Sequence, residues 1–211
     1  DIGTGTYTIL AQITAETLGV PLGHVRGEIG DSDFPPAPGS GGQFGAATAG
    51  SAAFEAGMNL RRALTELALG DPNSPLYGGP AEYVTFENGN IAIENRSETL
   101  AALVGRAAPE GVYVEGSISP AADARDYSQH TYGAHFAEVG VNQVTGEVRL
   151  RKMFGVFAAG RILNAKTAKS QITGGMIWGV GTALTEVNAI DPRYGSLIGQ
   201  DVGGYLIPAH A

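Results

Sequence analysis

The sequence contains no cysteine, one tryptophan and few basic residues. Without cysteine, these residues offer no disulfide, no thiolate ligand for zinc or an iron–sulfur cluster, and no cysteine nucleophile. Any redox metal must therefore be held by something other than a protein thiolate. The 211 residues include 13 Lys and Arg against 21 Asp and Glu, which gives a formal net charge of −8. This charge argues against nucleic acid as a partner.

Long hydrophobic runs are also missing. No apolar stretch reaches the roughly 18 residues that a membrane-spanning helix needs, and no signal-peptide pattern is present, so we expect no membrane insertion. The sequence leaves cytoplasm and periplasm open as compartments. With 43% apolar residues the chain can bury a core. It starts at Asp1 without an initiator Met and stops just after a strand-like run, so we expect a piece of a longer polypeptide.

Glycine is abundant. The 32 glycines among 211 residues are roughly twice the usual share of about 7%. Gly3-Thr4-Gly5-Thr6 runs into a helix predicted from Thr6 to Gly19, and a second loop, residues 39–45, runs into a helix predicted over 46–68. Glycines allow close backbone approach, and a helix N-terminus offers free N–H donors and positive charge. We therefore expect both loops to converge on one anionic ligand. An ordinary helix start and a flexible surface loop are the competing interpretations.

The remaining patterns predict an α+β fold with mixed or antiparallel sheets and packed helices. We expect two parts, residues 1–108 and 109–211. The predicted elements are a short strand over 25–29, a hairpin over 83–95 turning at Asn88-Gly89, a short helix from Ser97, a hairpin pairing 132–141 with 147–157 through Gly146, and a helix capped by Asn164 that runs to Leu184.

This last helix contains Gln171 followed by Gly174, Gly175 and two further glycines. Each glycine costs a helix about 0.5–1 kcal/mol relative to alanine, so close packing or the approach of a ligand is expected to compensate. The four histidines lack any metal-ligand spacing, and no catalytic triad can be recognised. We therefore assign no metal ligand.

Four segments together resemble the large molybdenum-binding subunit of the xanthine dehydrogenase/aldehyde oxidase family. They are DIGTGTYTILAQITAETLGVP, SGGQFGAATAGSAAF, YGAHFAEVGVNQVTGEVRLRK and AGRILNAKTAKSQITGGMIWGVG. Many homologues have Gln where this chain has Thr4, and the Thr variant resembles the bacterial aldehyde-oxidising branch. The resemblance covers essentially the whole chain and implies a molybdenum–pterin cofactor, expected here as molybdopterin cytosine dinucleotide. The metal is then held by the pterin dithiolene, so the lack of cysteine is no objection.

Residue by residue, the resemblance assigns a cofactor-binding set. Ile2, Gly3 and Thr4 are expected to contact the pterin end, and Gln171 to hydrogen-bond the cofactor. The second loop is expected to line its phosphates and pterin through Gly41, Gly42, Gln43, Phe44, Gly45 and Ala46.

The resemblance also implies a reaction, the oxidative hydroxylation of aldehydes or N-heterocycles with water as oxygen donor. Iron–sulfur clusters and FAD on partner subunits would take the electrons. The family's basic Glu belongs to a segment that these residues do not include, so we assign no catalytic residue and expect the piece alone to be inactive. A non-catalytic cofactor-binding or assembly module and a nucleotide-binding domain are the alternatives. Aldehyde versus purine substrate, dinucleotide versus mononucleotide pterin, oligomeric state and electron acceptor stay open.

Overall fold

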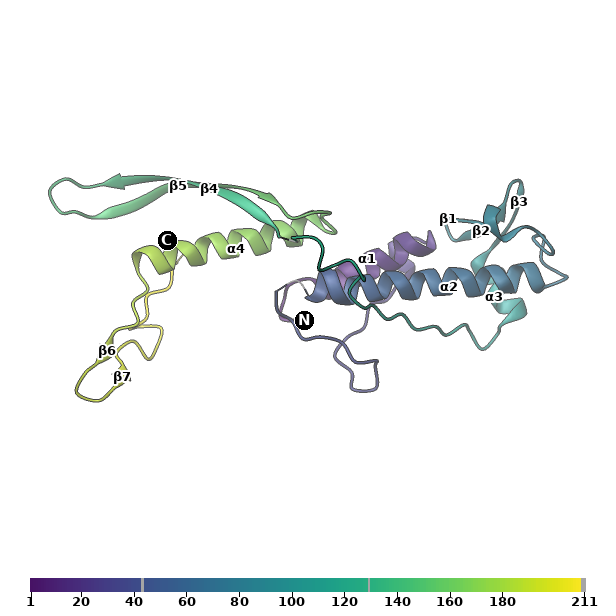
Figure 1. Cartoon of the computed structure of the whole chain (residues 1–211), viewed down its shortest axis with the longest axis horizontal. Coiled ribbons are helices and arrows are strands. Elements are labelled where there is room, and N and C mark those ends of the chain that lie inside the picture. Colours follow the sequence, from purple (N-terminus) through teal and green to yellow (C-terminus); the bar gives the residue numbers. More distant parts are fainter. Residues whose placement is uncertain (43, 129, 210–211) are drawn as a thin grey trace. The chain divides into compact units, whose positions relative to one another are not determined.

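The chain divides into two units, Asp1–Asp126 and Tyr127–Ala211, in a computed structural model that describes residues 1–42, 44–128 and 130–209 (Figure 1). The first unit contains α1 (Thr6–Leu18), the 3-10 turn η1 (Leu22–His24), the π-helical turn η2 (Phe44–Ala49), α2 (Gly50–Gly70), the 3-10 turn η3 (Ala81–Tyr83), β1 (Thr85–Glu87), β2 (Asn90–Ile93), β3 (Arg96–Thr99) and α3 (Leu100–Ala107). The second contains β4 (Tyr132–Val141), β5 (Val148–Ala158), α4 (Ala165–Leu184), β6 (Ile190–Asp191) and β7 (Ser196–Leu197). All described strand pairs are antiparallel, which confirms the α+β class.

Helix α1 ends where glycine predicts its end. Gly19 adopts the left-handed conformation with φ 61°. The Val20 N–H donates to the Ala15 carbonyl over 3.0 Å, which satisfies one of the last carbonyls of the helix. A Cβ on Gly19 would also collide with the Phe86 carbonyl of β1. Glycine is therefore required here both by the backbone conformation and by the approach of the sheet.

The core of the first unit lies between α2, α3 and the three-stranded sheet in the order β1-β2-β3. Its buried members come from four separate segments and are Leu64, Ala68, Leu76, Ile91, Ile93 and Leu103. Asn88 and Gly89 both have positive φ, 52° and 77°, as a two-residue type I′ hairpin turn requires. The predicted hairpin over 83–95 is confirmed.

One prediction for the first unit is wrong and another is displaced, because the short helix predicted from Ser97 is present as α3 but begins at Leu100. Ser97 does not begin a helix, because Arg96–Thr99 pairs with β2 as β3 and the Thr99 side chain then caps α3 by accepting from the Ala102 N–H over 3.1 Å. Residues 25–29 have no strand partner among the described residues. They run along α1 instead, where the Tyr7 hydroxyl donates to the Ile29 carbonyl over 3.2 Å.

The segment after α3 belongs to the first unit. Asn59 of α2 donates a side-chain hydrogen bond to the Glu115 carbonyl over 2.7 Å. At Gly116 the segment comes so close to α2 that a Cβ would overlap the Ala52 carbonyl and the Ala56 N–H. The packing therefore divides at 126/127, and the expected boundary at 108/109 does not coincide with it.

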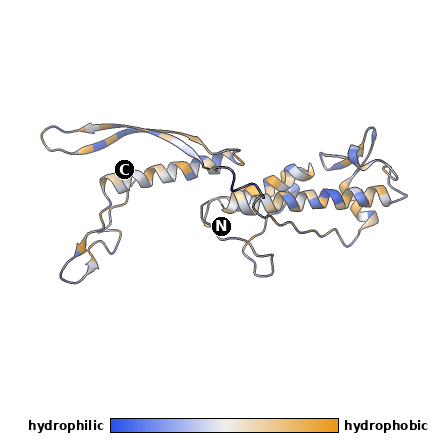
Figure 2. Ribbon diagram, viewed as in Figure 1, coloured by the Kyte–Doolittle hydropathy of each residue, from blue (hydrophilic) through white to orange (hydrophobic). Residues whose placement is uncertain are grey.

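The second unit is built on the β4–β5 hairpin, along which hydrophobic and hydrophilic residues are mixed (Figure 2). Gly146 supplies the turn with φ 74°, as predicted. A register shift between Glu138 and Val139 marks a β-bulge. One face of β5 is partly buried, and on it Gly155 leaves room for the Met176 sulfur of α4. The expected cap of α4 is confirmed, because the Asn164 side chain accepts from the Thr167 N–H over 3.0 Å.

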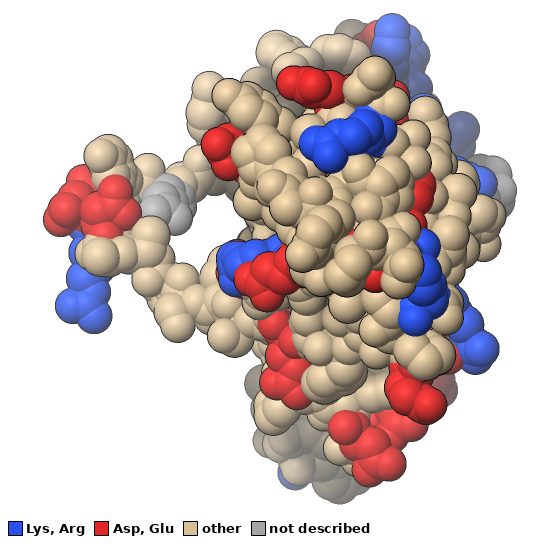
Figure 3. Space-filling model, turned by 90° about the vertical axis from the view of Figure 1, so that its right-hand side faces the viewer, with Lys and Arg blue, Asp and Glu red and all other residues tan. Residues whose placement is uncertain are grey.

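None of the helices in the described part of the chain combines the length and apolar character needed to cross a membrane. On the face shown in Figure 3, Lys and Arg side chains are scattered among Asp and Glu without forming a continuous basic area.

Candidate cofactor-binding site

The first glycine loop is held in place by the side-chain carboxylate of Asp1. Asp1 Oδ1 accepts from the backbone N–H groups of Gly3 and Thr4, each over 2.8 Å, and Oδ2 accepts from the Thr6 N–H over 2.8 Å. Gly3 and Gly5 have φ 95° and 91°, in the left-handed region that glycine tolerates best. The first turn of α1 thus already holds an anion, and that anion is an acidic side chain two residues before Gly3.

The set of cofactor contacts expected from the sequence does not include Asp1. The usual capping pattern gives no signal for it, because the N-cap position of α1 is Gly5 and Asp1 lies farther upstream. The structure shows why Asp1 matters: the loop bends so that its carboxylate accepts from the Thr6 N–H, five positions along the chain.

Helices α1 and α2 run side by side in the same direction (Figure 1). Close contacts along the pair establish this direction. A Cβ on Gly45 would lie 3.0 Å from Thr6 Oγ1, and a Cβ on Gly50 would lie 3.0 Å from Ile13 Cδ1. Further along, Gly57 packs on Thr17, so contacts on the two helices advance together. Their N-termini therefore lie at the same end, with Thr6 beside Gly45, and the convergence of the two loops on one ligand stays a prediction.

The second loop presents backbone without side chains around it. Cβ atoms built on Gly39 and Gly42 would meet nothing within 4 Å, and one on Gly41 would meet only Phe44 Cδ2, at 4.0 Å. Gly42 has φ 52°, whereas Gly39 and Gly41 are outside the left-handed region. Phe44 is 51% exposed, and Gln43 lies outside the described residues. A ligand could approach this backbone closely.

Gln171 lies in α4 and therefore belongs to the second unit. Its side chain is exposed, and Cβ atoms on Gly174 and Gly175 would meet nothing within 4 Å. Gly174 and Gly175 thus leave an open helix surface beside Gln171. That Gln171 faces the same ligand as the two loops stays a prediction.

A charged cluster in the first unit serves the fold. Arg106 donates to Asp71 over 2.5 Å and to Glu98 over 2.8 Å, and Glu98 also accepts from the Ser74 hydroxyl over 2.5 Å. The Arg106 guanidinium holds the pKa of Asp71 below its ordinary value. These groups connect the end of α2 to β3 and α3. No group of three or more His, Cys, Asp or Glu side chains in the described parts of the chain could hold a metal ion.

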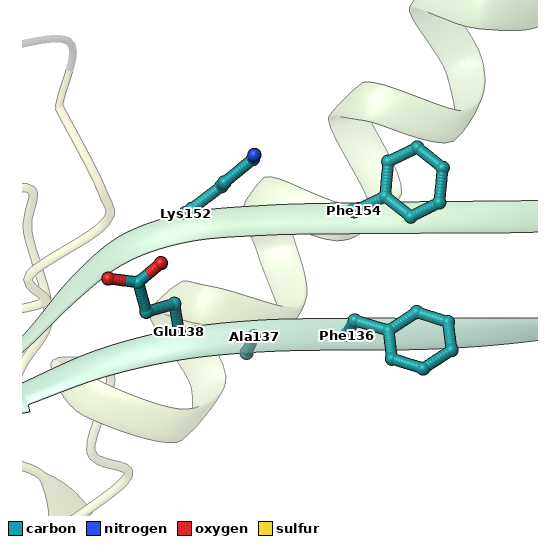
Figure 4. A pocket seen from close by; sticks show the side chains of 5 residues that line it. All are labelled: Phe136, Ala137, Glu138, Lys152 and Phe154. Carbon is teal, nitrogen blue, oxygen red and sulfur yellow. The ribbon is translucent and has the colours of Figure 1, made fainter.

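Two surface hollows lie away from the predicted residues. One, of about 460 Å³, is bordered by the 35–38 segment, α2 and the 115–118 segment. The other, of about 350 Å³, lies on the β4–β5 hairpin between Phe136, Phe154, Glu138 and Lys152 (Figure 4). The Phe136 and Phe154 rings lie 6.4 Å apart on the outer face of the hairpin. Neither hollow is bordered by a described residue of the predicted cofactor-binding set.

The molybdopterin cofactor-binding domain model matches residues 1–211. The chain belongs to this domain family. It is 46% identical over 213 residues to the aldehyde oxidoreductase molybdenum-binding subunit PaoC of Escherichia coli K12, covering 100% of this chain and 27% of PaoC. It is also 29% identical to the nicotine 6-hydroxylase large subunit of Paenarthrobacter nicotinovorans, covering 90% of this chain and 24% of that subunit.

Among solved structures, quinoline 2-oxidoreductase from Pseudomonas putida 86 superposes with a TM-score of 0.83 at 24% identity, over 100% of this chain and 27% of that one. This likeness concerns the fold. The molybdopterin-binding domain described here spans about a quarter of the length of these relatives.

The described residues fit a pterin cofactor in one respect. Gly3, Gly41 and Gly42 expose backbone that a Cβ would cover, so a flat ring or a phosphate can approach closely. In another respect they qualify the prediction, because Asp1 already uses the N–H groups of Gly3, Thr4 and Thr6. Donors to a phosphate are thus expected from the second loop and the start of η2.

Proposed function

We propose that this domain is the cofactor-cradling part of a molybdenum hydroxylase that oxidises aldehydes or N-heterocycles with water as the oxygen source. The observation that carries the proposal is the meeting of two exposed glycine loops, Thr6 against Gly45, at the shared end of two parallel helices. The family membership and the relatives that act on an aldehyde and on nicotine support it. When bound, the cofactor supplies the molybdenum centre at which the substrate is hydroxylated.

Within this chain we assign binding and orientation. Ile2, Gly3 and Thr4 are proposed to contact the pterin end, since Ile2 is 81% exposed and the Gly3 backbone is open. Residues 41–46 are proposed to contact the phosphates and pterin. Gln171 is proposed to hydrogen-bond the cofactor, because its amide can both donate and accept. We further propose the cytosine dinucleotide form of the cofactor, and iron–sulfur and flavin partners as electron acceptors.

The full-length protein tests this function directly. Molybdenum should be present after purification, and acid treatment should release a cytosine nucleotide. Turnover should be measured with an aromatic aldehyde, a purine and an artificial electron acceptor. Absence of molybdenum and pterin from folded, full-length protein would refute the proposal, whereas activity on purine alone would narrow the substrate class to N-heterocycles.

Gly41 and Gly39 form a matched pair for testing the second loop. Both have open space at the Cβ position and neither has a left-handed φ, so alanine should strain neither backbone. Only Gly41 belongs to the proposed contact set. Gly41→Ala should lower the molybdenum content of the full-length enzyme and Gly39→Ala should leave it unchanged. Equal molybdenum contents in the two variants would show that the Gly41 backbone does not contact the cofactor.

The 211-residue chain by itself should not turn over. No glutamate within it matches the base that the family uses, and a positioned base contributes about 10²–10⁴-fold in rate. Incubation with cofactor, an aromatic aldehyde and an artificial acceptor should therefore give no sustained oxidation. Protein-dependent turnover would mean that a glutamate in this chain acts as the base.

A further inference from the structure

The Asp1 carboxylate makes more hydrogen bonds than a simple helix cap requires. Oδ1 accepts from the N–H groups of Gly3 and Thr4 and from Thr4 Oγ1, the last over 3.1 Å. Oδ2 accepts from the N–H of Thr6. Because both oxygens are used, the carboxylate fixes the loop at three separate backbone positions.

This anchoring opposes a specific weakness of the loop. Gly3 and Gly5 gain conformational freedom from their missing side chains, and that freedom must be lost when a ligand is held by the backbone. A loop that is already fixed loses less on binding. The carboxylate therefore prepares the conformation of the loop before any ligand arrives.

The anchoring also reaches the second loop. Thr6 is held through its N–H by Asp1, and its side chain lies where a Cβ on Gly45 would come within 3.0 Å. The Thr4 and Thr6 hydroxyls lie 3.4 Å apart, which places Thr4 in the same network. One carboxylate thus sets the position of the first loop against the start of η2.

We propose that Asp1 is a positioning residue for the cofactor, acting through the two loops and not through contact with the cofactor itself. This rests on the proposed function. It means that the N-terminal end of α1 does not bind an anionic group of the cofactor. The N–H donors there already bind Asp1, and a second negative charge beside the carboxylate would be repelled. The first loop then meets the cofactor through groups of Ile2, Gly3 and Thr4 other than these donors.

The test uses full-length Asp1→Ala and Asp1→Asn enzymes. Asparagine keeps an acceptor for Gly3 and Thr4 but replaces the second oxygen with an amide donor that cannot serve Thr6. We expect Asp1→Ala to lose cofactor about tenfold faster than wild type on dilution, equivalent to ~1.4 kcal/mol. Asp1→Asn should fall between the two. Hydrogen exchange at the N–H groups of Gly3, Thr4 and Thr6 should accelerate in the same order.

Asn142→Ala provides the matched control. Asn142 Oδ1 also accepts from two turn N–H groups, those of Val144 at 2.9 Å and Thr145 at 3.2 Å, but in the β4–β5 turn. This variant should lose cofactor at the wild-type rate. Equal losses in Asn142→Ala and Asp1→Ala would show general destabilisation and overturn the assignment.

Wild-type cofactor retention in folded Asp1→Ala would also overturn it. If Asp1→Ala does not fold, wild-type retention and exchange in Asp1→Asn would do the same. Wild-type protein without molybdenum would instead refute the proposed function, so the two failures can be told apart.

Discussion

The two units differ in how they hold their shape. In the first, Ala68, Leu76, Ile91 and Leu103 are fully buried between helices and sheet. Among the described residues of the second, Gly181 alone is buried, and Trp178 is 71% exposed. The first unit therefore has a packed core of its own, whereas the helix that carries Gln171 has little core of its own. Loop geometry can be tested locally, but the role of Gln171 needs the whole protein.

Separating the units should give the largest effect. Residues 1–126 produced alone should unfold cooperatively, because their core joins four segments. Residues 127–211 alone should show no cooperative transition, since a two-stranded hairpin with one helix buries too little apolar surface. Circular dichroism during urea titration checks both pieces. A sharp transition in residues 127–211 would break the comparison.

A single leucine should sharpen it. Leu103→Ala should destabilise the 211-residue chain by about 2–5 kcal/mol, because the cavity forms in a packed core. Leu206→Ala in the second unit should change stability by about 0.5 kcal/mol or less, since Leu206 is 56% exposed. Chemical denaturation followed at the far-ultraviolet helix signal measures both. Similar losses at the two positions would show that the second unit packs as tightly as the first.

Gln171→Ala in the full-length enzyme should lower turnover by about tenfold, the value of one lost hydrogen bond to a ligand, with little change in melting temperature. Gln200→Ala is the control, because Gln200 is in the same unit and its side chain donates to the Leu197 carbonyl over 2.7 Å. Unchanged turnover and cofactor content in Gln171→Ala would make Gln171 an ordinary surface residue.

Arg106→Leu should give the smallest effect, visible mainly as a change in pH dependence. Hydrogen bonding to Arg106 lowers the pKa of Asp71, so its contribution to stability is present above the ordinary value near 3.8 and is lost as pH falls through the lower folded pKa. The variant should be less stable at pH 7 and lose less on acidification through this range. Urea midpoints measured across the acid range check this, and parallel profiles would contradict it.

Predictions from local chemistry were accurate. Gly19 ends α1, Asn88-Gly89 turns the first hairpin, and Asn164 caps α4, as expected. Each depends on groups within a few residues: a positive φ that glycine or asparagine tolerates, or a side-chain oxygen that reaches an N–H two or three positions away. The glycine loops of the candidate site were recognised for the same reason.

The sequence by itself therefore determined where helices and turns begin and end, and which loops leave backbone open to a ligand. Only the tertiary structure decided the rest. Arg96–Thr99 became a strand because β2 offered it partners, and residues 25–29 remained unpaired because no described strand did. The parallel packing of α1 on α2 brought Thr6 to Gly45, and the bend of the first loop brought the Asp1 carboxylate to the N–H of Thr6. Such contacts depend on which surfaces meet after folding, and no local propensity encodes that meeting.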